Sequence, residues 1–128
     1  MSFTHTLRMQ WSGGGRVITK DVEATGAAQT SISETVADSE TNCEIAFTMD
    51  VSEIAAIYIV SSQDVTLETN SGSEAAETIS LVADVPYVWH ADSYYTNLLA
   101  TDITALFVTN ASGEEATFQL EVVYDPTP

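Results

Sequence analysis

The chain has 128 residues, of which 45% are hydrophobic and 17% are charged. This length suits one domain, and the composition excludes a largely disordered chain. The 19 acidic residues outnumber three basic ones and give a formal net charge of -16. We therefore expect no binding to nucleic acid or to anionic membranes, because both attract cations.

The N-terminal segment predicts a long β-hairpin. Apolar and polar side chains alternate from Phe3 to Trp11, a period of two that is typical of a strand. Three glycines at positions 13–15 allow a tight reversal, and residues 16–24 form a weaker second strand pattern. We expect residues 1–24 to form an N-terminal hairpin or arm within a single β-sandwich domain that spans residues 1–128.

The rest of the chain repeats short apolar-alternating runs that end at turn-forming residues. Residues 43–49 predict a strand that buries Cys43, and either Asp50 or Ser52 is expected to cap one short turn. The apolar run 55–60 is typical of a strand covered on both faces. Further strands are predicted at residues 26–33, 65–69, 77–82, 87–89, 103–109 and 117–124, with an irregular segment at 90–102.

This succession of short strands defines the expected fold class. The runs recur at spacings of about 8 to 12 residues with no helical pattern between them, which is the signature of a sandwich or jelly roll. We predict an all-β protein, an antiparallel β-sandwich that is jelly-roll-like with roughly eight strands.

The sequence carries no catalytic signature, and we expect the protein not to be an enzyme. Cys43 lacks the basic neighbours that would activate a thiolate, and neither His5 nor His90 has a cysteine partner for zinc. There is no nucleophile elbow and no phosphate-binding loop. We predict no catalytic residue, no metal and no cofactor. A calcium ion held by loop carboxylates stays open as an alternative, although no segment matches an EF-hand loop. The carboxylates that flank turns are Asp84, Asp92, Asp102 and Asp125.

Aromatic side chains gather in one short segment that contains Tyr87, Trp89, Tyr94 and Tyr95. One interpretation is an aromatic platform for a sugar or a protein partner. The other is that Tyr87 and Trp89 belong to the core and only part of the Tyr94-Tyr95 pair is exposed. Asn110 begins a glycosylation sequon, but we interpret that segment as a hairpin loop.

The C-terminal third resembles a known family. The segments that carry the resemblance are Pro86–Trp89, Leu98–Leu99, Asp102–Ser112 and Thr117–Asp125. They are similar to small virion proteins of tailed bacteriophages, which fold as β-sandwiches or jelly rolls and decorate or cement the capsid. The resemblance does not extend to the glycine-rich hairpin. It implies a structural decoration protein, a homotrimer, that binds the outer surface of the major capsid protein shell and stabilises it.

Within this hypothesis we expect two contact regions. The arm is the candidate for the capsid contact, because its cations can meet acidic capsid residues; the residues are Phe3, Arg8, Arg16 and Lys20. The irregular segment is the candidate for the subunit interface, through Tyr94, Tyr95 and Leu98.

The expected location is the outer surface of the virion, after synthesis in the host cytoplasm. The first residues lack the basic and apolar regions of a secretory signal. The alternative function, from a different class, is a carbohydrate-binding module of a phage tail or cell-surface assembly, in which the aromatic side chains would stack on sugar.

Overall fold

The computed structural model describes residues 2–126. Its regular secondary structure within these residues is ten strands and one 3-10 turn. Two strands form the N-terminal arm, β1 (Phe3–Gly13) and β2 (Arg16–Gly26). Eight more form the sandwich: β3 (Ala28–Val36), β4 (Cys43–Ile45), β5 (Ile54–Ser61), β6 (Val65–Thr69), β7 (Thr78–Leu81), β8 (Tyr87–His90), β9 (Leu106–Thr109) and β10 (Ala116–Tyr124). The predicted all-β fold is confirmed.

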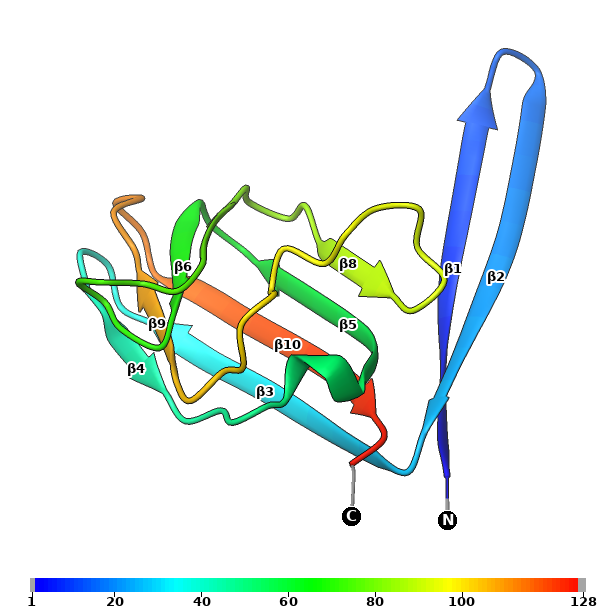
Figure 1. Ribbon diagram of the computed structural model, residues 1–128. Coiled ribbons are helices and arrows are strands. Elements are labelled where there is room, and N and C mark those ends of the chain that lie inside the picture. The colour runs from blue at the N-terminus through cyan, green and yellow to red at the C-terminus, as the bar shows by residue number, and fades with distance from the viewer. Residues whose placement is uncertain (1, 127–128) are drawn as a thin grey trace.

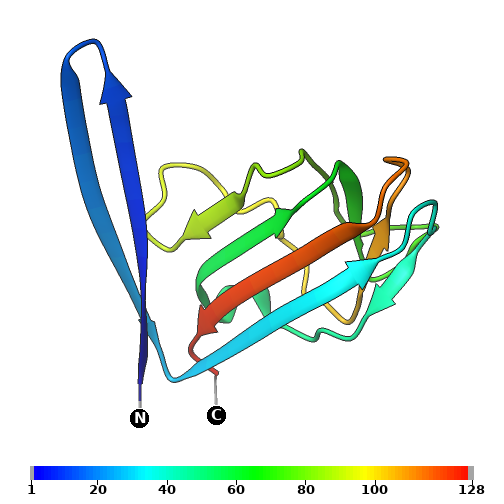
Figure 2. The same cartoon turned by 180° about the vertical axis from the view of Figure 1, so that it is seen from behind.

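The eight sandwich strands pair in a nested order. β3 pairs with β10, β4 with β9, β5 with β8 and β6 with β7, all antiparallel. The pairs β5–β10 and β6–β9 then join these ribbons into two four-stranded sheets, β3-β10-β5-β8 and β4-β9-β6-β7. The nesting, in which one long hairpin is rolled onto itself, is the connectivity of a jelly roll. Figures 1 and 2 show the two layers and the arm beside them.

The core lies between the two sheets. Strand β10 shows how the sequence builds it, because Phe118, Leu120 and Val122 are fully buried while the residues between them are exposed. This alternation places one face of each strand in the core. Other fully buried side chains come from both sheets and their loops: Ile57, Ile59, Leu67, Leu99, Ile103, Leu106 and Val108. No helix among the described residues has the length and apolar character needed to cross a membrane.

Two predicted strands are shorter than the alternation suggested. The strand expected at residues 43–49 ends at Ile45, yet Phe47 and Met49 remain buried. Its far end survives as an isolated bridge between Met49 and Ile103, and β9 starts only at Leu106. Burial thus continues with period two after the ladder of hydrogen bonds has stopped. Cys43 was predicted to be buried. It packs against the core but is only half-buried.

The predicted turn at residues 50–53 is confirmed. The Asp50 side chain accepts a hydrogen bond of 3.0 Å from the Ser52 backbone N–H and caps the 3-10 turn η1 (Val51–Glu53). Bonds from the Ser52 hydroxyl and N–H stabilise the charged carboxylate and lower the pKa of Asp50.

Strand β5 is covered on both faces along only part of its length. Ile57 and Ile59 face the core between the sheets, and Ala56 on the opposite face is buried beneath the arm. Tyr58 lies on the same face as Ala56 but is 36% exposed. The prediction of a fully covered strand therefore holds at Ala56 and is wrong at Tyr58, because the arm leaves the sheet between them.

The arm is seated on the sandwich by small side chains. Ala24 of the arm packs with Ala56 of β5 and Val123 of β10, and Phe3 and Leu7 cover this cluster. We call this contact, formed by Ala24, Ala56, Val123, Phe3 and Leu7, the seat. At its lower end the backbones of β2 and β10 approach each other closely. A Cβ atom added to Gly26 would lie 2.4 Å from the Tyr124 carbonyl oxygen, closer than non-bonded atoms approach.

Two polar contacts add to the seat. The Ala27 N–H donates to the Asp125 carboxylate at 2.8 Å. The His5 ring nitrogen Nε2 lies 2.7 Å from the Gln29 side-chain oxygen, which joins β1 to β3. The direction of the arm is therefore fixed by contacts at its base.

We predict that Gly26→Val destabilises the protein by about 1–3 kcal/mol, the cost of forcing extra atoms into a packed contact. Chemical denaturation followed by far-UV circular dichroism measures this. The matched control is Ser12→Val, an exposed site on the partner strand of the arm, where a change within about 0.5 kcal/mol is expected. A Gly26→Val protein as stable as wild type would contradict the close contact with Tyr124.

Candidate interaction site on the arm

The arm is a regular antiparallel ribbon with two unlike faces. Eleven residue pairs align without a bulge from Phe3↔Gly26 to Gly13↔Arg16. We call the face that carries Leu7 and Ala24 the inner face, because its base rests on the sandwich. Its other members, given by the alternation, are Phe3, His5, Met9, Trp11, Arg16, Ile18, Lys20 and Val22.

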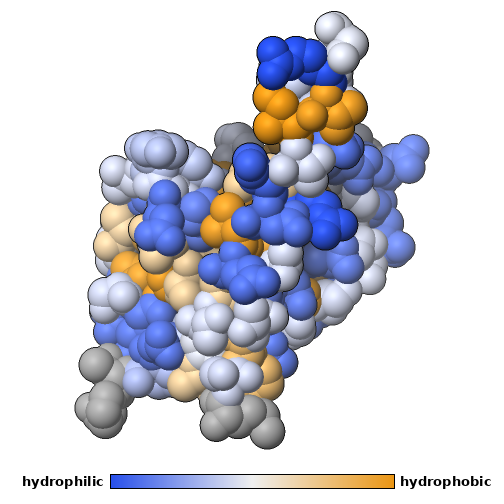
Figure 3. Space-filling view, turned by 90° about the vertical axis from the view of Figure 1, so that its right-hand side faces the viewer, coloured by the Kyte–Doolittle hydropathy of each residue, from blue (hydrophilic) through white to orange (hydrophobic). Residues whose placement is uncertain are grey.

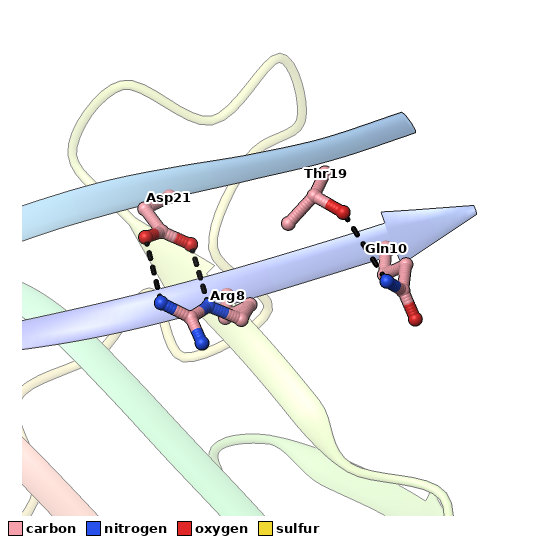
Figure 4. Close-up of polar contacts among 4 residues, drawn as sticks. All are labelled: Arg8, Gln10, Thr19 and Asp21. Carbon is pink, nitrogen blue, oxygen red and sulfur yellow. Dashed lines mark hydrogen bonds and ion pairs between the residues drawn. The ribbon is translucent and has the colours of Figure 1, made fainter. Parts of the chain in front are cut away.

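The outer face satisfies three cross-strand pairs of its polar groups within the arm. Arg8 forms a two-pronged ion pair with Asp21, with nitrogen–oxygen distances of 2.9 and 3.0 Å. The Gln10 side-chain amide donates to the Thr19 hydroxyl at 3.2 Å, as Figure 4 shows. The hydroxyls of Thr4 and Thr25 lie 2.9 Å apart and share a further hydrogen bond. These cross-strand pairs brace the ribbon and need no partner.

The inner face changes character along its length. Its base is covered by the sandwich, but every residue from 8 to 21 is exposed. The arm extends past the sandwich (Figures 1 and 2), and Figure 3 shows hydrophobic residues gathered near its free end. On the inner face, Trp11 is 74% exposed, Met9 49% and Ile18 47%. We call these three residues, with Arg16 and Lys20 on the same face, the tip patch.

A tight turn holds the tip patch in register. Gly14 and Gly15 are the two loop residues between Gly13 and Arg16, with φ values of 59° and 79°. Positive φ at both central positions is the geometry of a type I′ turn, which matches the twist of the paired strands. Glycine is suited to both positions, because other residues are strained there. Trp11 and Ile18 consequently stand directly opposite each other.

Positive charge is confined to the arm. The arm contains three cations and two acidic residues, Asp21 and Glu23. The rest of the chain contains 17 acidic residues and no Lys or Arg. The hydrogen bonds that Arg8 donates to the Asp21 carboxylate raise the pKa of Arg8 and lower the pKa of Asp21. Within residues 2–126, Arg16 and Lys20 form no ion pair. Two uncompensated cations therefore flank the apolar residues of the tip patch.

A groove of about 1010 Å³ separates the arm from the edge of the sandwich. On the arm side it is lined by residues of both faces of the ribbon, three apolar residues of the inner face and four polar residues of the outer face: Leu7, Met9, Val22, Thr6, Arg8, Asp21 and Glu23. On the opposite side it is lined by residues of β5, of β8 and of the segments that flank β8: Tyr58, Pro86, Val88, His90, Asp92, Ser93, Tyr94 and Tyr95. The His90 ring nitrogen Nδ1 is buried with no hydrogen-bond partner among the described residues. The groove thus combines apolar and aromatic side chains with polar ones, which is typical of binding sites.

The four predicted capsid-contact residues do not form one surface. Phe3 lies at the base of the arm, half-buried in the seat, at the opposite end of the ribbon from Arg16. Arg8 lies on the outer face and is held by Asp21. Only Arg16 and Lys20 are brought together, in the tip patch. The exposure of Met9, Trp11 and Ile18 was missed, because their alternation is the same as that of covered residues.

The aromatic segment supports the second of the two interpretations. Tyr87 and Trp89 are half-buried against the core. Burial raises the pKa of Tyr87, and the Trp89 indole N–H donates to the Tyr95 carbonyl at 3.1 Å. The Tyr95 hydroxyl donates to the Val88 carbonyl, whereas Tyr94 extends fully into solvent. These four rings do not form a continuous exposed platform.

The predicted subunit-interface residues lie on the surface of one loop. Tyr94 is fully exposed, Tyr95 is 54% exposed and Leu98 is 56% exposed. Tyr94 and Tyr95 line the groove, whereas Leu98 does not. The Leu98 N–H donates to the Tyr87 hydroxyl at 2.8 Å, which ties this part of the loop to β8.

The described residues offer little for catalysis. Burial and the nearby Glu40 carboxylate raise the pKa of Cys43, so its thiol stays protonated at neutral pH. No three His, Cys, Asp or Glu side chains within residues 2–126 come together to hold a metal. Asn110 is fully buried in the loop between β9 and β10. Its side-chain amide donates to the carbonyls of Val36, Ala37 and Glu114, so it is closed to glycosylation as folded.

Comparison with known proteins finds no matching family model, no matching curated protein and no matching solved structure.

We predict that the two tryptophans differ sharply in access to solvent. In a Trp89→Phe variant, the remaining Trp11 should be quenched by acrylamide nearly as strongly as free indole. In Trp11→Phe, the half-buried Trp89 should emit at shorter wavelength and be quenched less. Steady-state fluorescence at concentrations where light scattering reports a monomer tests this. Equal quenching of the two variants would contradict an exposed tip patch.

Proposed function

We propose that this protein is a structural protein with no catalytic role, a decoration protein that binds the outer surface of a viral capsid shell and stabilises it. The arm carries the proposal. A folded sandwich holds out a braced ribbon whose end exposes an indole, two aliphatic side chains and two uncompensated cations. Exposed patches of this kind mark sites where another macromolecule binds.

The connectivity of the sandwich supports a structural role. Double-sheet jelly rolls recur in viral capsid proteins and in lectins. Of these two classes, the carbohydrate binders would need stacked aromatic side chains at the surface, and here Trp89 and Tyr95 are held by hydrogen bonds to their own loop. A protein-binding role therefore accounts for more of the exposed surface.

The charge distribution supports an outer location. The sandwich and its loops carry 17 acidic residues and no Lys or Arg. Such a surface is repelled by packaged nucleic acid. It also keeps a protein soluble before assembly. The outside of a shell is the position in which this surface meets solvent.

In the proposed attachment, the sandwich and the arm have different roles. The sandwich provides a rigid body with a continuous core, and the tip patch provides the contact. Trp, Ile and Met bury large apolar areas when they enter a pocket, and Arg is enriched at binding hot spots. Many copies on one shell, and the homotrimer implied by the resemblance, would add avidity to modest individual contacts.

The first test is mass spectrometry of virus particles purified from the cells that produce the protein. We expect the intact chain as a major component of the particles, at a fixed ratio to the main shell protein. Its absence from particles that are made while the protein is abundant in the same cells would overturn the proposed function.

The second test concerns the tip patch. Arg16→Glu combined with Lys20→Glu should lower occupancy on particles about tenfold or more, which corresponds to a loss of about 1.4 kcal/mol or more of binding energy. Arg8→Gln is the matched control, since this cation lies on the other face and is already neutralised by Asp21. Co-sedimentation of purified variants with stripped particles measures both. Equal loss in the variant and the control would show that the tip patch is not the contact.

A further inference from the structure

Between two copies of this chain, opposite charges can pair only where an arm takes part. All cations lie in the arm, and outside the arm every charged side chain is acidic. Contacts between two sandwiches therefore bring like charges together, which is unfavourable. Contact between an arm and a sandwich is the arrangement that electrostatics favours.

The groove has the properties that the tip patch requires. Its walls present Leu7, Val88 and Tyr94, which suit the apolar residues of the patch. Two acidic residues that form no ion pair within residues 2–126, Glu23 and Asp92, also line it. They can meet the free cations at the end of an incoming arm.

An arm cannot fill the groove of its own chain. The ribbon is paired without a bulge up to the turn, and residues near its own base form one wall of the groove. Folding the tip back would break the ladder. The tip patch continues the row of side chains that holds Leu7 and Met9, which line the groove, so a second copy related by a rotation can present its tip to the groove and receive one in return.

We propose that the tip patch of one copy binds in the groove of a second copy and links the subunits through their arms. This inference goes beyond the proposed function: a tip patch that is docked in a neighbour does not contact a shell at the same time, so association in solution and attachment to particles compete for the same residues. The free half of the arm is a two-stranded ribbon, which has little stability alone in water. Docking in a neighbour adds a covering layer to its inner face.

The test is the mass of the full chain in solution, by light scattering after size exclusion and by sedimentation over a wide concentration range. Wild type should form a closed oligomer of at least two copies of the 13.8 kDa chain. Trp11→Ser combined with Ile18→Ser should weaken association by about tenfold or more. Val17→Ser, an exposed neighbour on the outer face, should leave it unchanged. A wild-type monomer at every concentration, or an oligomer that survives the double change, would overturn the proposal.

A mixing experiment separates docking in the groove from contact between two tips. Tyr94→Arg combined with Asp92→Arg should block the groove while the tip patch stays intact, because both changes place cations where Arg16 and Lys20 of the incoming arm would dock. This variant and the tip variant should each be monomeric alone, and their mixture should form a heterodimer through the one intact tip and the one intact groove. No association in the mixture would contradict the groove as the receptor. Circular dichroism of each variant confirms that it is folded.

The outcomes are separable from those for the proposed function. Association through the arm in solution, without the chain in purified particles, would leave this inference standing and remove the capsid role. A monomer that is nevertheless present in particles would do the reverse.

Discussion

The close contact between the arm and the sandwich is the constraint on which the rest of this surface depends. The contact is built from residues with little or no side chain, Ala24 and Gly26 on the arm and Ala56 on β5. Small residues allow two backbones to approach, and interiors are packed densely enough that one added methyl group is felt. Larger side chains here would lift the arm, open the groove and move the tip patch away from its present line.

The seat also explains why one face of the ribbon has two roles. Leu7 and Met9 are successive members of the inner face, yet Leu7 packs against the sandwich and Met9 is exposed. The change occurs where the arm passes the edge of the sheet, the same place at which Tyr58 of β5 becomes exposed. An apolar face that continues beyond its support is costly in water, because the exposed area contributes nothing to folding. A binding partner that covers these side chains, as proposed above, would account for this exposed apolar face.

The sequence predicted the elements well and the site poorly, for a physical reason. Alternation with period two reports that a side chain is on the apolar face of a strand, and this was sufficient for the hairpin and for β10. It does not report what lies opposite that face. Trp11 and Phe3 obey the same rule, but one is 74% exposed and the other packs in the seat. Only the three-dimensional arrangement distinguishes them.

Pairing between distant segments was beyond the reach of local patterns for the same reason. The jelly-roll order requires β3 to lie beside β10, with Ser31 opposite Glu121, and no local signal specifies that choice. The four predicted contact residues were separated for a related reason. Arg8 and Lys20 are both cations at even positions of the N-terminal hairpin, but the register pairs even positions of β1 with odd positions of β2, so the two side chains face opposite ways. The cross-strand register places Asp21 beside Arg8 and Met9 beside Lys20.

The two faces of the arm together restrict how a partner can approach. The outer face pairs several of its charges and amide groups internally, as in the bonds from Arg8 to Asp21 and from Gln10 to Thr19. Groups already satisfied within a chain gain little from a second surface, since a new hydrogen bond there only replaces an existing one. The inner face has unpaired cations and uncovered apolar side chains, so contacts made there would bring a net gain. Because the arm is fixed to the sandwich at its base, a partner bound as proposed on the inner face would see the sandwich in one orientation.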